Sequence, residues 1–178
     1  NSNYNNITSN LSSSYVGIFG GTVGGSLLSL GSSSYNNFKN NTLIDKARTG
    51  ALMILIKKFG NNPEPTGNLL YGNIITSYSP IVGTVESGYG ILQLDSASNN
   101  NISNNIFTSY NATTLNIIGS NPEHFNHTFS NNLVNTKNLA YYFNQNNISI
   151  SHNTTLGLLY IANSNNITIN NLTMQNAN

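Results

Sequence analysis

Residues 146–174 contain one short unit twice, and this repeat constrains the fold more than any other part of the sequence. Residues 146–150 (NNISI) recur 19 positions later as residues 165–169 (NNITI). Each copy joins an Asn pair, which favours a turn, to an alternating apolar and polar run. Alternation with period two is typical of a β-strand, because successive side chains point to opposite faces. A strand that recurs beside turn-forming residues at a near-fixed period predicts a solenoid.

The same unit can be followed towards the N-terminus at wider spacing. Its aligned apolar residues are Ile7, Phe38, Leu70, Ile102, Phe129, Ile148 and Ile167, at successive spacings of 31, 32, 32, 27, 19 and 19 along the chain. The shortening predicts loops in the early units that the late units lack. Short apolar runs between the units fit buried strands better than helices, at residues 16–19, 26–30, 51–56, 90–94, 115–118, 139–143 and 158–161. Residues 45–58 have some helical character, but Gly50 interrupts them and we expect a strand there.

Composition excludes several classes of function. Charged residues make up 6% of the chain, against about 25% in typical domains, and the net charge is +1. Such a charge gives no footprint for nucleic acid or an anionic membrane. No apolar run approaches the roughly 20 residues of a membrane-spanning helix. The absence of Cys excludes disulfides and thiolate metal sites.

Asn is the commonest residue, at 37 positions, and a solenoid gives it two physical uses. Tight corners need residues that tolerate positive φ, which Asn does better than β-branched residues. Asn side chains that stack in successive units can also bond one another through their amides, satisfying polar groups that would otherwise be buried without partners. We therefore expect Asn at corners and in ladders, within a single domain over residues 1–178 or a segment of a longer repeat protein.

Amide and hydroxyl surfaces with few charges suit an extracellular location, and the first residue, Asn1, predicts a removed signal peptide or a chain cut from something longer. Ten N-x-S/T sequons are consistent with this location, although composition alone would give a similar number. They make these Asn residues candidates for N-glycosylation: Asn6, Asn10, Asn40, Asn101, Asn111, Asn126, Asn147, Asn153, Asn166 and Asn171. An Asn side chain stacked in a buried ladder cannot carry a glycan, so Asn147 and Asn166 have two interpretations.

The units NNISNNIF (residues 100–107), NNISISHN (146–153) and NSNNITINN (163–171) resemble the repeats of NosD-like surface proteins. These belong to the broad carbohydrate-binding and sugar-hydrolase group of right-handed parallel β-helices. The resemblance extends from about residue 69 to the end. It implies an all-β, right-handed parallel β-helix of about seven coils, with loop insertions in the N-terminal coils. Because that group includes polysaccharide lyases, hydrolases, adhesins, phage tailspikes and surface-layer proteins, it leaves the function open.

A β-sandwich is the alternative fold, because many short strands at about ten-residue spacing also describe one. An exported, Asn-rich sandwich would resemble pilin subunits joined by donor-strand exchange, with residues 1–11 completing a neighbouring subunit. The short in-register repeat at residues 146–150 and 165–169 has no natural place in a sandwich. We therefore favour the β-helix.

Candidate catalytic and metal-binding residues are few. Glycoside cleavage needs paired carboxylates, but only Asp45 and Asp95 lie beside strands, and we expect both to be isolated. The other acids, Glu64, Glu86 and Glu123, are predicted to be solvated in loops.

A copper or zinc site would use His124 and His127, with His152 and Met174 in other coils; we expect exposed loop histidines instead. Arg48 is the expected partner of Asp45 on the same surface. The ten Tyr residues are expected at core edges and corners rather than on a sugar-stacking surface.

We predict no catalytic residue, metal or cofactor. The expected function is a non-catalytic extracellular structural protein, a building block of a surface filament, surface layer or adhesin, that carries N-glycans and self-associates. The alternatives are a carbohydrate-binding or polysaccharide-cleaving β-helix and a donor-strand-exchanged pilin subunit. Open solenoid ends expose strand edges that a neighbouring copy or further coils of a longer chain must cover. Self-association, end to end or lateral, is the expected partnership, without nucleic acid or a membrane span.

Overall fold

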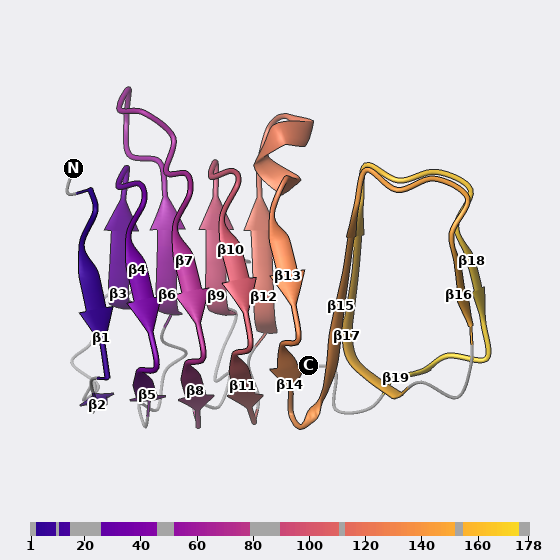
Figure 1. The fold of residues 1–178 in the computed structure, drawn as a ribbon, viewed down its shortest axis with the longest axis horizontal. Helices are drawn as coiled ribbons and strands as arrows, with labels where there is room; N and C mark the ends of the chain where they lie inside the picture. The colour runs from indigo at the N-terminus through magenta and orange to yellow at the C-terminus, as the bar shows by residue number, and fades with distance from the viewer. Residues whose placement is uncertain are drawn as a thin grey trace, which may run out of the picture.

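The computed structural model describes residues 3–9, 11–14, 26–45, 52–78, 90–110, 113–151 and 155–174. Across these residues the protein is all-β, and most of its strands form parallel sheets (Figure 1). One short 3₁₀ helix, η1 (Pro122–Phe125), interrupts the strands. No helix in this part of the chain is long and apolar enough to cross a membrane.

The described strands form three larger sheets and one small sheet. The five-stranded sheet comprises β1 (Asn6–Thr8), β4 (Asn37–Lys39), β7 (Leu69–Tyr71), β10 (Asn101–Ser103) and β13 (Thr128–Ser130). The eight-stranded sheet comprises β2 (Leu11–Ser14), β5 (Thr42–Asp45), β8 (Ile74–Ser77), β11 (Ile106–Ser109), β14 (Leu133–Val134), β15 (Lys137–Phe143), β17 (Thr155–Ala162) and β19 (Thr173–Met174). The four-stranded sheet comprises β3 (Ser26–Gly31), β6 (Leu52–Lys57), β9 (Gly90–Asp95) and β12 (Thr113–Ile118), and the small sheet comprises β16 (Ser149–Ser151) and β18 (Thr168–Asn170).

From β1 to β12 the chain visits the three larger sheets in a fixed order, and each set of three strands is a three-strand unit. The registers confirm the alignment made from the sequence. In the five-stranded sheet these residues lie in one column: Ile7, Phe38, Leu70, Ile102 and Phe129. The wider spacing in the N-terminal part of the sequence is therefore the length of one three-strand unit.

The apolar runs expected to be strands are strands wherever the structure describes them. Of residues 45–58, the segment with some helical character, residue 45 ends β5 and residues 52–57 form β6, and residues 46–51 lie outside the described residues. The run at residues 16–19 lies outside the described residues. Strands β3, β6, β9 and β12 supply much of the core, in which Met53, Ile54 and Leu92 are almost completely buried. Burying each such side chain contributes about 1.5 to 3 kcal/mol to folding.

The structure differs from the sequence alignment after Phe129, where the chain reverses. Residues Asn135 and Thr136 have φ of 47° and 70° and form a two-residue hairpin loop between β14 and β15. Positive φ at both central residues is the geometry of a type I′ turn. The seven aligned units are therefore not one series. Ile148 and Ile167 belong to two-strand units that follow this hairpin, the first made of β15 and β16 and the second of β17 and β18.

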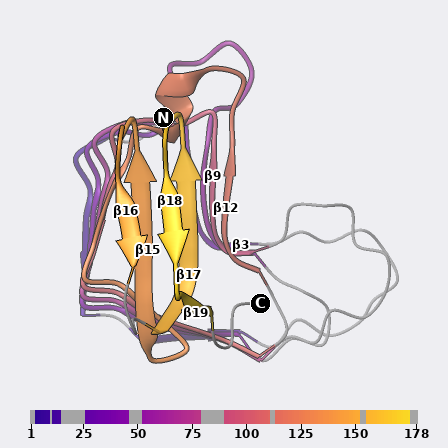
Figure 2. The same cartoon turned by 90° about the vertical axis from the view of Figure 1, so that its right-hand side faces the viewer.

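The two-strand units stack crosswise to the three-strand units. The strands β1 to β13 are spread along the long axis in Figure 1. Strands β15 and β17 overlap in that view and are separated in Figure 2. Side chains of β15 and β17 pack against the main core, namely Leu139, Tyr141, Leu158 and Tyr160. The C-terminal units therefore cover the end of the three-strand stack, which is where a repeat protein needs a cap.

Two ladders of Asn side chains follow the corners on either side of the five-stranded sheet, as expected from the sequence. The first ladder comprises Asn5, Asn36, Asn68 and Asn100, and the second comprises Asn41, Asn73, Asn105 and Asn132. In each ladder the Nδ2 group of one Asn donates to Oδ1 of the Asn in the next unit at 2.9–3.1 Å. The same oxygen also accepts the backbone N–H of the donating residue. These ladders satisfy amides that would otherwise be buried at a cost.

Beside the two buried ladders the two uses of Asn fall to adjacent residues, whereas the exposed Asn147 and Asn166 have positive φ and also bond each other through their amides. The positive φ values occur one position before the ladder Asn, as at Asn40 (54°) and Asn104 (55°). The ladder residues that follow them, Asn41 and Asn105, are buried. The Asn pairs in the sequence therefore combine a corner residue with a ladder residue.

The pairing disfavours the β-sandwich. Among the described strands, β14 and β15 form the one antiparallel pair, and every other pair is parallel. Immunoglobulin-like sandwiches are built from antiparallel sheets. The N-terminal strands β1 and β2 also pair with β4 and β5 of their own chain. In donor-strand exchange these strands would instead pair with a neighbouring subunit.

Candidate functional site

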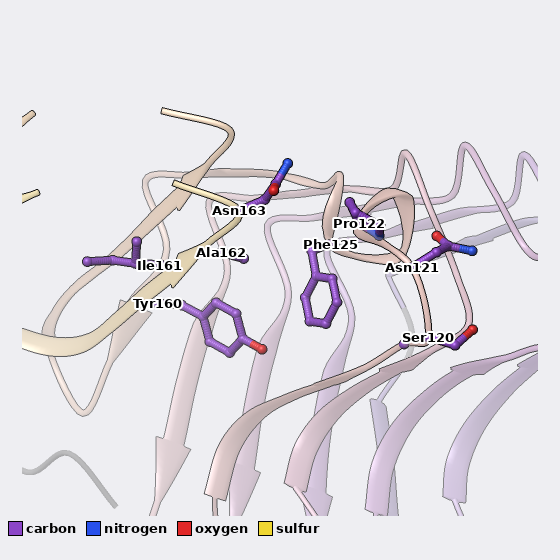
Figure 3. A pocket seen from close by; sticks show the side chains of 9 residues that line it. Ser120, Asn121, Pro122, Phe125, Tyr160, Ile161, Ala162 and Asn163 are labelled. Atoms are coloured by element: carbon purple, nitrogen blue, oxygen red, sulfur yellow. The ribbon is translucent and has the colours of Figure 1, made fainter. Parts of the chain in front are cut away.

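An open groove of about 460 Å³ lies between η1 and β17 (Figure 3). It forms where the C-terminal units cover the end of the three-strand stack. Its lining comes from two segments that are distant in the chain: Gly119, Ser120, Asn121, Pro122 and Phe125 on one side, and Tyr160, Ile161, Ala162 and Asn163 on the other.

Local sequence explains the shape of the η1 wall. The helix starts with Pro122 in its first turn, where a missing N–H costs nothing. Asn121 is the N-cap, and its Oδ1 accepts the N–H of His124 at 3.3 Å. Gly119 lies so close to His124 that an added Cβ would stand 2.3 Å from the Cβ of His124. The turn before η1 therefore requires glycine.

The β17 wall ends in a row of aromatic rings. Phe129, Tyr141 and Tyr160 follow one another with ring centroids 4.5 and 5.4 Å apart. Burial raises the pKa of the Tyr141 phenol, with a smaller contribution from neighbouring Tyr160, and burial also raises the pKa of Tyr160. Both hydroxyls therefore stay protonated. The Tyr141 hydroxyl donates to the carbonyl oxygen of Phe125, which ties β15 to η1.

The groove combines aromatic and polar uncharged groups. Figure 3 shows the ring of Tyr160 and the ring of Phe125 in the groove, with the amides of Asn121 and Asn163 at its upper rim. None of the lining residues carries a charge. Such a surface suits an uncharged ligand that offers both an apolar face and hydroxyl groups.

His124 lies behind the η1 wall and is buried. Its Nδ1 accepts the N–H of Ser120 at 3.1 Å, which leaves Nε2–H to donate to Oε1 of Glu64, also at 3.1 Å. Lys58 Nζ lies 3.6 Å from the same carboxylate oxygen. The hydrogen bond from His124 is the main factor that lowers the pKa of Glu64. This network fixes η1 to the loop after β6.

His127 occupies the next position of the first Asn ladder. Its Nδ1 accepts the backbone N–H of Asn100 at 3.3 Å, and its Nε2–H donates to the carbonyl oxygen of His124 at 3.0 Å. Burial lowers the pKa of His127 to about 4, so the ring is neutral. His127 therefore ends the ladder, because its ring accepts a backbone N–H as an Asn side chain would but donates its own N–H to a carbonyl oxygen of η1.

The expectation that His124 and His127 are exposed loop histidines is wrong, since their exposed fractions are 3% and 6%. Both rings are held by protein hydrogen bonds. In the part of the chain that the structure describes, no three His, Asp or Glu side chains gather as a metal site would require. His152 lies outside the described residues.

The two strand-associated acids lie in different sheets. Asp45 ends β5 in the eight-stranded sheet, and Asp95 ends β9 in the four-stranded sheet. Asp95 forms a half-buried ion pair with Lys57 on the neighbouring strand at 2.9 Å. Paired carboxylates of glycoside hydrolases stand roughly 5 to 10 Å apart on one site.

Glu64 and Glu123, both expected to be solvated in loops, differ in their surroundings. Glu64 is not a free solvated carboxylate, because it bonds His124. Glu123 is exposed on η1. Glu86 and the expected partner of Asp45, Arg48, lie outside the described residues.

Four of the described tyrosines stack in pairs between successive units. Tyr4 stacks on Tyr35 with centroids 5.3 Å apart, and Tyr78 stacks on Tyr110 at 4.9 Å. These rings remain 47–76% exposed. They therefore cover corners between successive units and also leave aromatic faces in solvent.

Seven of the ten candidate glycosylation sites lie among the described residues. Six of these are exposed, namely Asn6, Asn40, Asn101, Asn147, Asn166 and Asn171. Asn126 is half-buried, and its Nδ2 donates to Asn99 Oδ1 at 2.8 Å. Asn10, Asn111 and Asn153 lie outside the described residues.

The buried ladder Asn residues and the sequon Asn residues are different sets. Asn147 and Asn166 combine both interpretations, because they are exposed and the Nδ2 of Asn166 donates to Oδ1 of Asn147 at 2.6 Å.

The described sheets have eight edge strands, of which β12, β13 and β16 lie within the described chain and the other five form two groups nearer its ends. The N-terminal edge consists of β1, β2 and β3, each the first strand of its sheet, and the C-terminal edge consists of β18 and β19. On the C-terminal edge Ile169 is 47% and Met174 42% exposed. Their register partners one unit earlier, Ile150 and Leu156, are only 9% and 4% exposed. The edge residues continue core columns that no described strand covers.

Both edges are uncharged. The six basic and five acidic residues of the chain all lie between Lys39 and Lys137. Soluble proteins commonly protect sheet edges with charges, especially Lys, or with Pro. Neither of the two edges carries such a residue.

Comparisons identify no relative of this chain: no family model, curated protein or solved structure matches it. The groove between η1 and β17 escaped sequence reasoning because its walls are far apart in the chain. The one local signal was the segment around Asn121 and Pro122, which reads as a loop without indicating its partner.

Proposed function

We propose that the chain is a right-handed parallel β-helix that serves as a non-catalytic building block of an extracellular structural assembly, such as a surface filament, surface layer or adhesin. The support for the fold is the fixed order in which the chain visits three parallel sheets, with units in register. Parallel strands of one sheet are joined by right-handed connections in nearly all proteins. The crosswise two-strand units form its C-terminal cap.

The observation that carries the structural function is the pair of uncharged strand edges. An uncovered edge presents unpaired N–H and C=O groups, and evolution normally protects it. Here the edges lack charge, and Ile169 and Met174 stand where core residues stand one unit earlier. Covering these positions with another copy satisfies the backbone and buries the apolar side chains. Self-association is therefore part of the proposal.

The proposal of a non-catalytic role is supported by the placement of the described acids. Asp45 and Asp95 lie in different sheets, and Asp95 is engaged by Lys57. The remaining described acids, Glu64 and Glu123, lie beside η1, where Glu64 is held by His124. These positions offer no carboxylate pair for cleavage of a sugar chain.

Glycans and self-association place different demands on the sequons. Glycans on Asn40 and Asn101 would project from corner and outer-sheet positions in the middle of the stack. Asn6 lies on β1, and Asn166 and Asn171 flank β18, so glycans there would stand beside the edges. We propose that the glycans of an assembled form are attached to Asn40 and Asn101, which lie away from the edges.

The assembly itself is directly testable on the purified chain without glycans. We expect electron micrographs to show fibres, sheets or discrete oligomers, and sedimentation velocity to show a mass that rises with protein concentration. The physical reason is the burial of Ile169, Met174 and the strand edges. A chain that remains monomeric at the highest attainable concentration would contradict the proposed function.

A second candidate function is the binding of neutral carbohydrate, favoured by the groove at η1. Sugar rings have an apolar C–H face that packs on aromatic side chains and hydroxyls that bond amides. The groove offers Phe125 and Tyr160 for the first and Asn121, Asn163 and Ser120 for the second. The uncharged lining selects against acidic polysaccharides, whose carboxylates would find no cation there.

This candidate is tested by titrating the protein with neutral oligosaccharides and following binding by calorimetry. We expect Tyr160→Ala to weaken binding about tenfold or more, since an aromatic contact contributes about 0.5 to 1.5 kcal/mol beyond its buried area. Tyr71→Ala, which removes an exposed ring away from the groove, is the matched control and should bind as the wild type does. Equal affinity of the two variants, or no binding by the wild type, would exclude the groove as a sugar site.

A further inference from the structure

We propose that two stacked tyrosine pairs, Tyr4–Tyr35 and Tyr78–Tyr110, are sites of oxidative cross-linking, at which a one-electron oxidant of the peroxidase class joins successive units covalently as dityrosine. The inference goes beyond the proposed function, because each bond forms within one chain and needs neither self-association nor the groove. It gives a chain without Cys a covalent bond between neighbouring units of its stack.

The two residues of each pair occupy equivalent positions in successive units. Tyr4 and Tyr35 precede the paired strands β1 and β4 by the same interval, and Tyr78 and Tyr110 directly follow the paired strands β8 and β11. Neighbouring strands lie about 4.7 to 4.9 Å apart, so like side chains that leave them in the same direction meet. Tyr4 and Tyr35 also share a left-handed corner conformation, with φ of 61° and 57°.

The rings of both pairs are close together and accessible from solvent. The ring centroids of Tyr4 and Tyr35 stand 5.3 Å apart with planes 10° from parallel, and those of Tyr78 and Tyr110 stand 4.9 Å apart at 16°. All four side chains are exposed, so an oxidant can reach them and the rings can turn to bring their ortho carbons together. Holding two reactants side by side makes their coupling effectively unimolecular, which favours it over encounters between chains.

The reaction uses the ordinary chemistry of a phenol. Each tyrosine loses one electron and one proton and becomes a phenoxyl radical, whose unpaired electron is shared between the oxygen and the ortho carbons. The two radicals join through a carbon–carbon bond between ortho positions, and the hydrogens of those carbons move to the oxygens and restore both phenols. The pair thus loses two hydrogen atoms in all. Hydrogen peroxide takes up the two electrons and two protons and becomes two molecules of water.

The composition of the chain directs such an oxidant to tyrosine. Cys and Trp, the other side chains that readily give up an electron, do not occur in the chain, whereas Tyr occurs at ten positions. Met, which is present twice, takes up oxygen and forms a sulfoxide rather than a cross-link. Radicals therefore form on tyrosine, and those on a stacked pair have a coupling partner beside them.

A third pair, Tyr141 and Tyr160, is also stacked but is expected not to react. Its ring centroids are 5.4 Å apart, with planes 21° from parallel. Both side chains are half-buried, and the Tyr141 hydroxyl donates to the carbonyl oxygen of Phe125. Burial also raises the pKa of both phenols, which disfavours the loss of a proton. Exposure therefore separates the two reactive pairs from a pair with similar stacking.

The test treats the full chain, at low concentration, with a peroxidase and limiting hydrogen peroxide. We expect dityrosine fluorescence in a product that migrates as a monomer on denaturing gels. Tandem mass spectrometry of its peptides should show the 4–35 and 78–110 links, each with two hydrogen atoms lost, and no 141–160 link. Because each link closes a loop of the unfolded chain, the cross-linked protein should also unfold at a higher urea concentration than the untreated protein.

Single substitutions assign each link to its pair. Tyr78→Phe should abolish the 78–110 link and keep the 4–35 link, and Tyr35→Phe should do the reverse. Tyr71→Phe is the matched control and should keep both links, because Tyr71 is exposed but its register neighbours are Lys39 and Ser103. Circular dichroism of each variant before oxidation confirms that it is folded.

Three results would overturn the proposal. These are dityrosine that includes Tyr71 as often as the stacked residues, links that form only between chains, and no dityrosine under conditions that couple a tyrosine-containing peptide. The proposed function is judged separately by the oligomeric state of the untreated protein. A chain that forms both links while it remains monomeric supports this inference and contradicts the proposed self-association.

Discussion

Replacing Asn73 by Ala is expected to lower the free energy of unfolding by about 3 to 5 kcal/mol. Asn73 is fully buried in the second ladder, and its Nδ2 donates to Asn105 Oδ1 and to the Phe38 carbonyl oxygen, both at 2.9 Å. Its Oδ1 accepts the backbone N–H and the Nδ2 of Asn41. Ala removes the acceptor of the Asn41 N–H and one donor each from Asn105 Oδ1 and the Phe38 carbonyl oxygen, although Asn105 Oδ1 keeps the backbone N–H of residue 73. Each buried group left unsatisfied costs about 1 to 3 kcal/mol. Urea denaturation followed by circular dichroism measures the loss.

The matched control is Asn101→Ala. Asn101 lies on β10 of the five-stranded sheet, and its side chain is exposed and belongs to neither ladder. A surface substitution of this kind usually changes the free energy of unfolding by less than about 0.5 kcal/mol. If the two variants lost similar amounts, the ladders would not stabilise the stack, and the Asn bias of the chain would need another explanation.

Lowering the pH from 7 to 4 is expected to reduce the stability of the protein by about 3 kcal/mol through His127. In the folded protein burial lowers the pKa of His127 to about 4, whereas an unfolded His titrates near 6.5. Between these values the unfolded chain binds a proton that the folded chain does not, so stability falls as the pH falls. The geometry agrees, because protonated Nδ1 could no longer accept the N–H of Asn100.

Replacing His127 by Asn provides the test. Asn is the residue used in every earlier position of this ladder, so the variant keeps an acceptor for Asn100 and removes the titrating ring. We expect urea denaturation at pH 7 and at pH 4.5 to give a smaller difference in free energy for this variant than for the wild type. Glu64 acts in a lower window, because its pKa is lowered and its contribution is lost only as the pH falls below its ordinary value. An unchanged pH dependence in the variant would show that His127 is not responsible for it.

Much of the three-strand stack could be predicted from residue patterns because its interactions repeat along the chain. Ile7, Phe38 and Leu70 share a column because the interval between them is one full passage through the three sheets. The Asn pairs beside the strands likewise predict corners and ladders, because a corner needs a residue at positive φ and the buried position after it needs an amide that bonds the next unit.

The hairpin that ends this stack has no comparable signal. Type I′ turns usually contain Asn-Gly, whereas this one contains Asn135 and Thr136. A β-branched residue at positive φ is disfavoured by its own backbone, so local preference argues against the turn that forms. The packing of Leu139, Tyr141 and Leu158 on the stack offsets that cost, and such long-range packing is not visible in a local pattern.

By itself, the sequence determined the repeat, the registers within each stack and the corner and ladder positions of Asn, because each depends on neighbours at a constant spacing. The tertiary structure decided what depends on two segments meeting without a periodic relation. It reversed the chain at Asn135, so that the short C-terminal repeat forms a crosswise cap rather than two further turns of the same stack. It buried His127 at the end of a ladder and placed Tyr160 beside Phe125 in a groove. These contacts follow from how the stack ends, and no spacing in the chain encodes that.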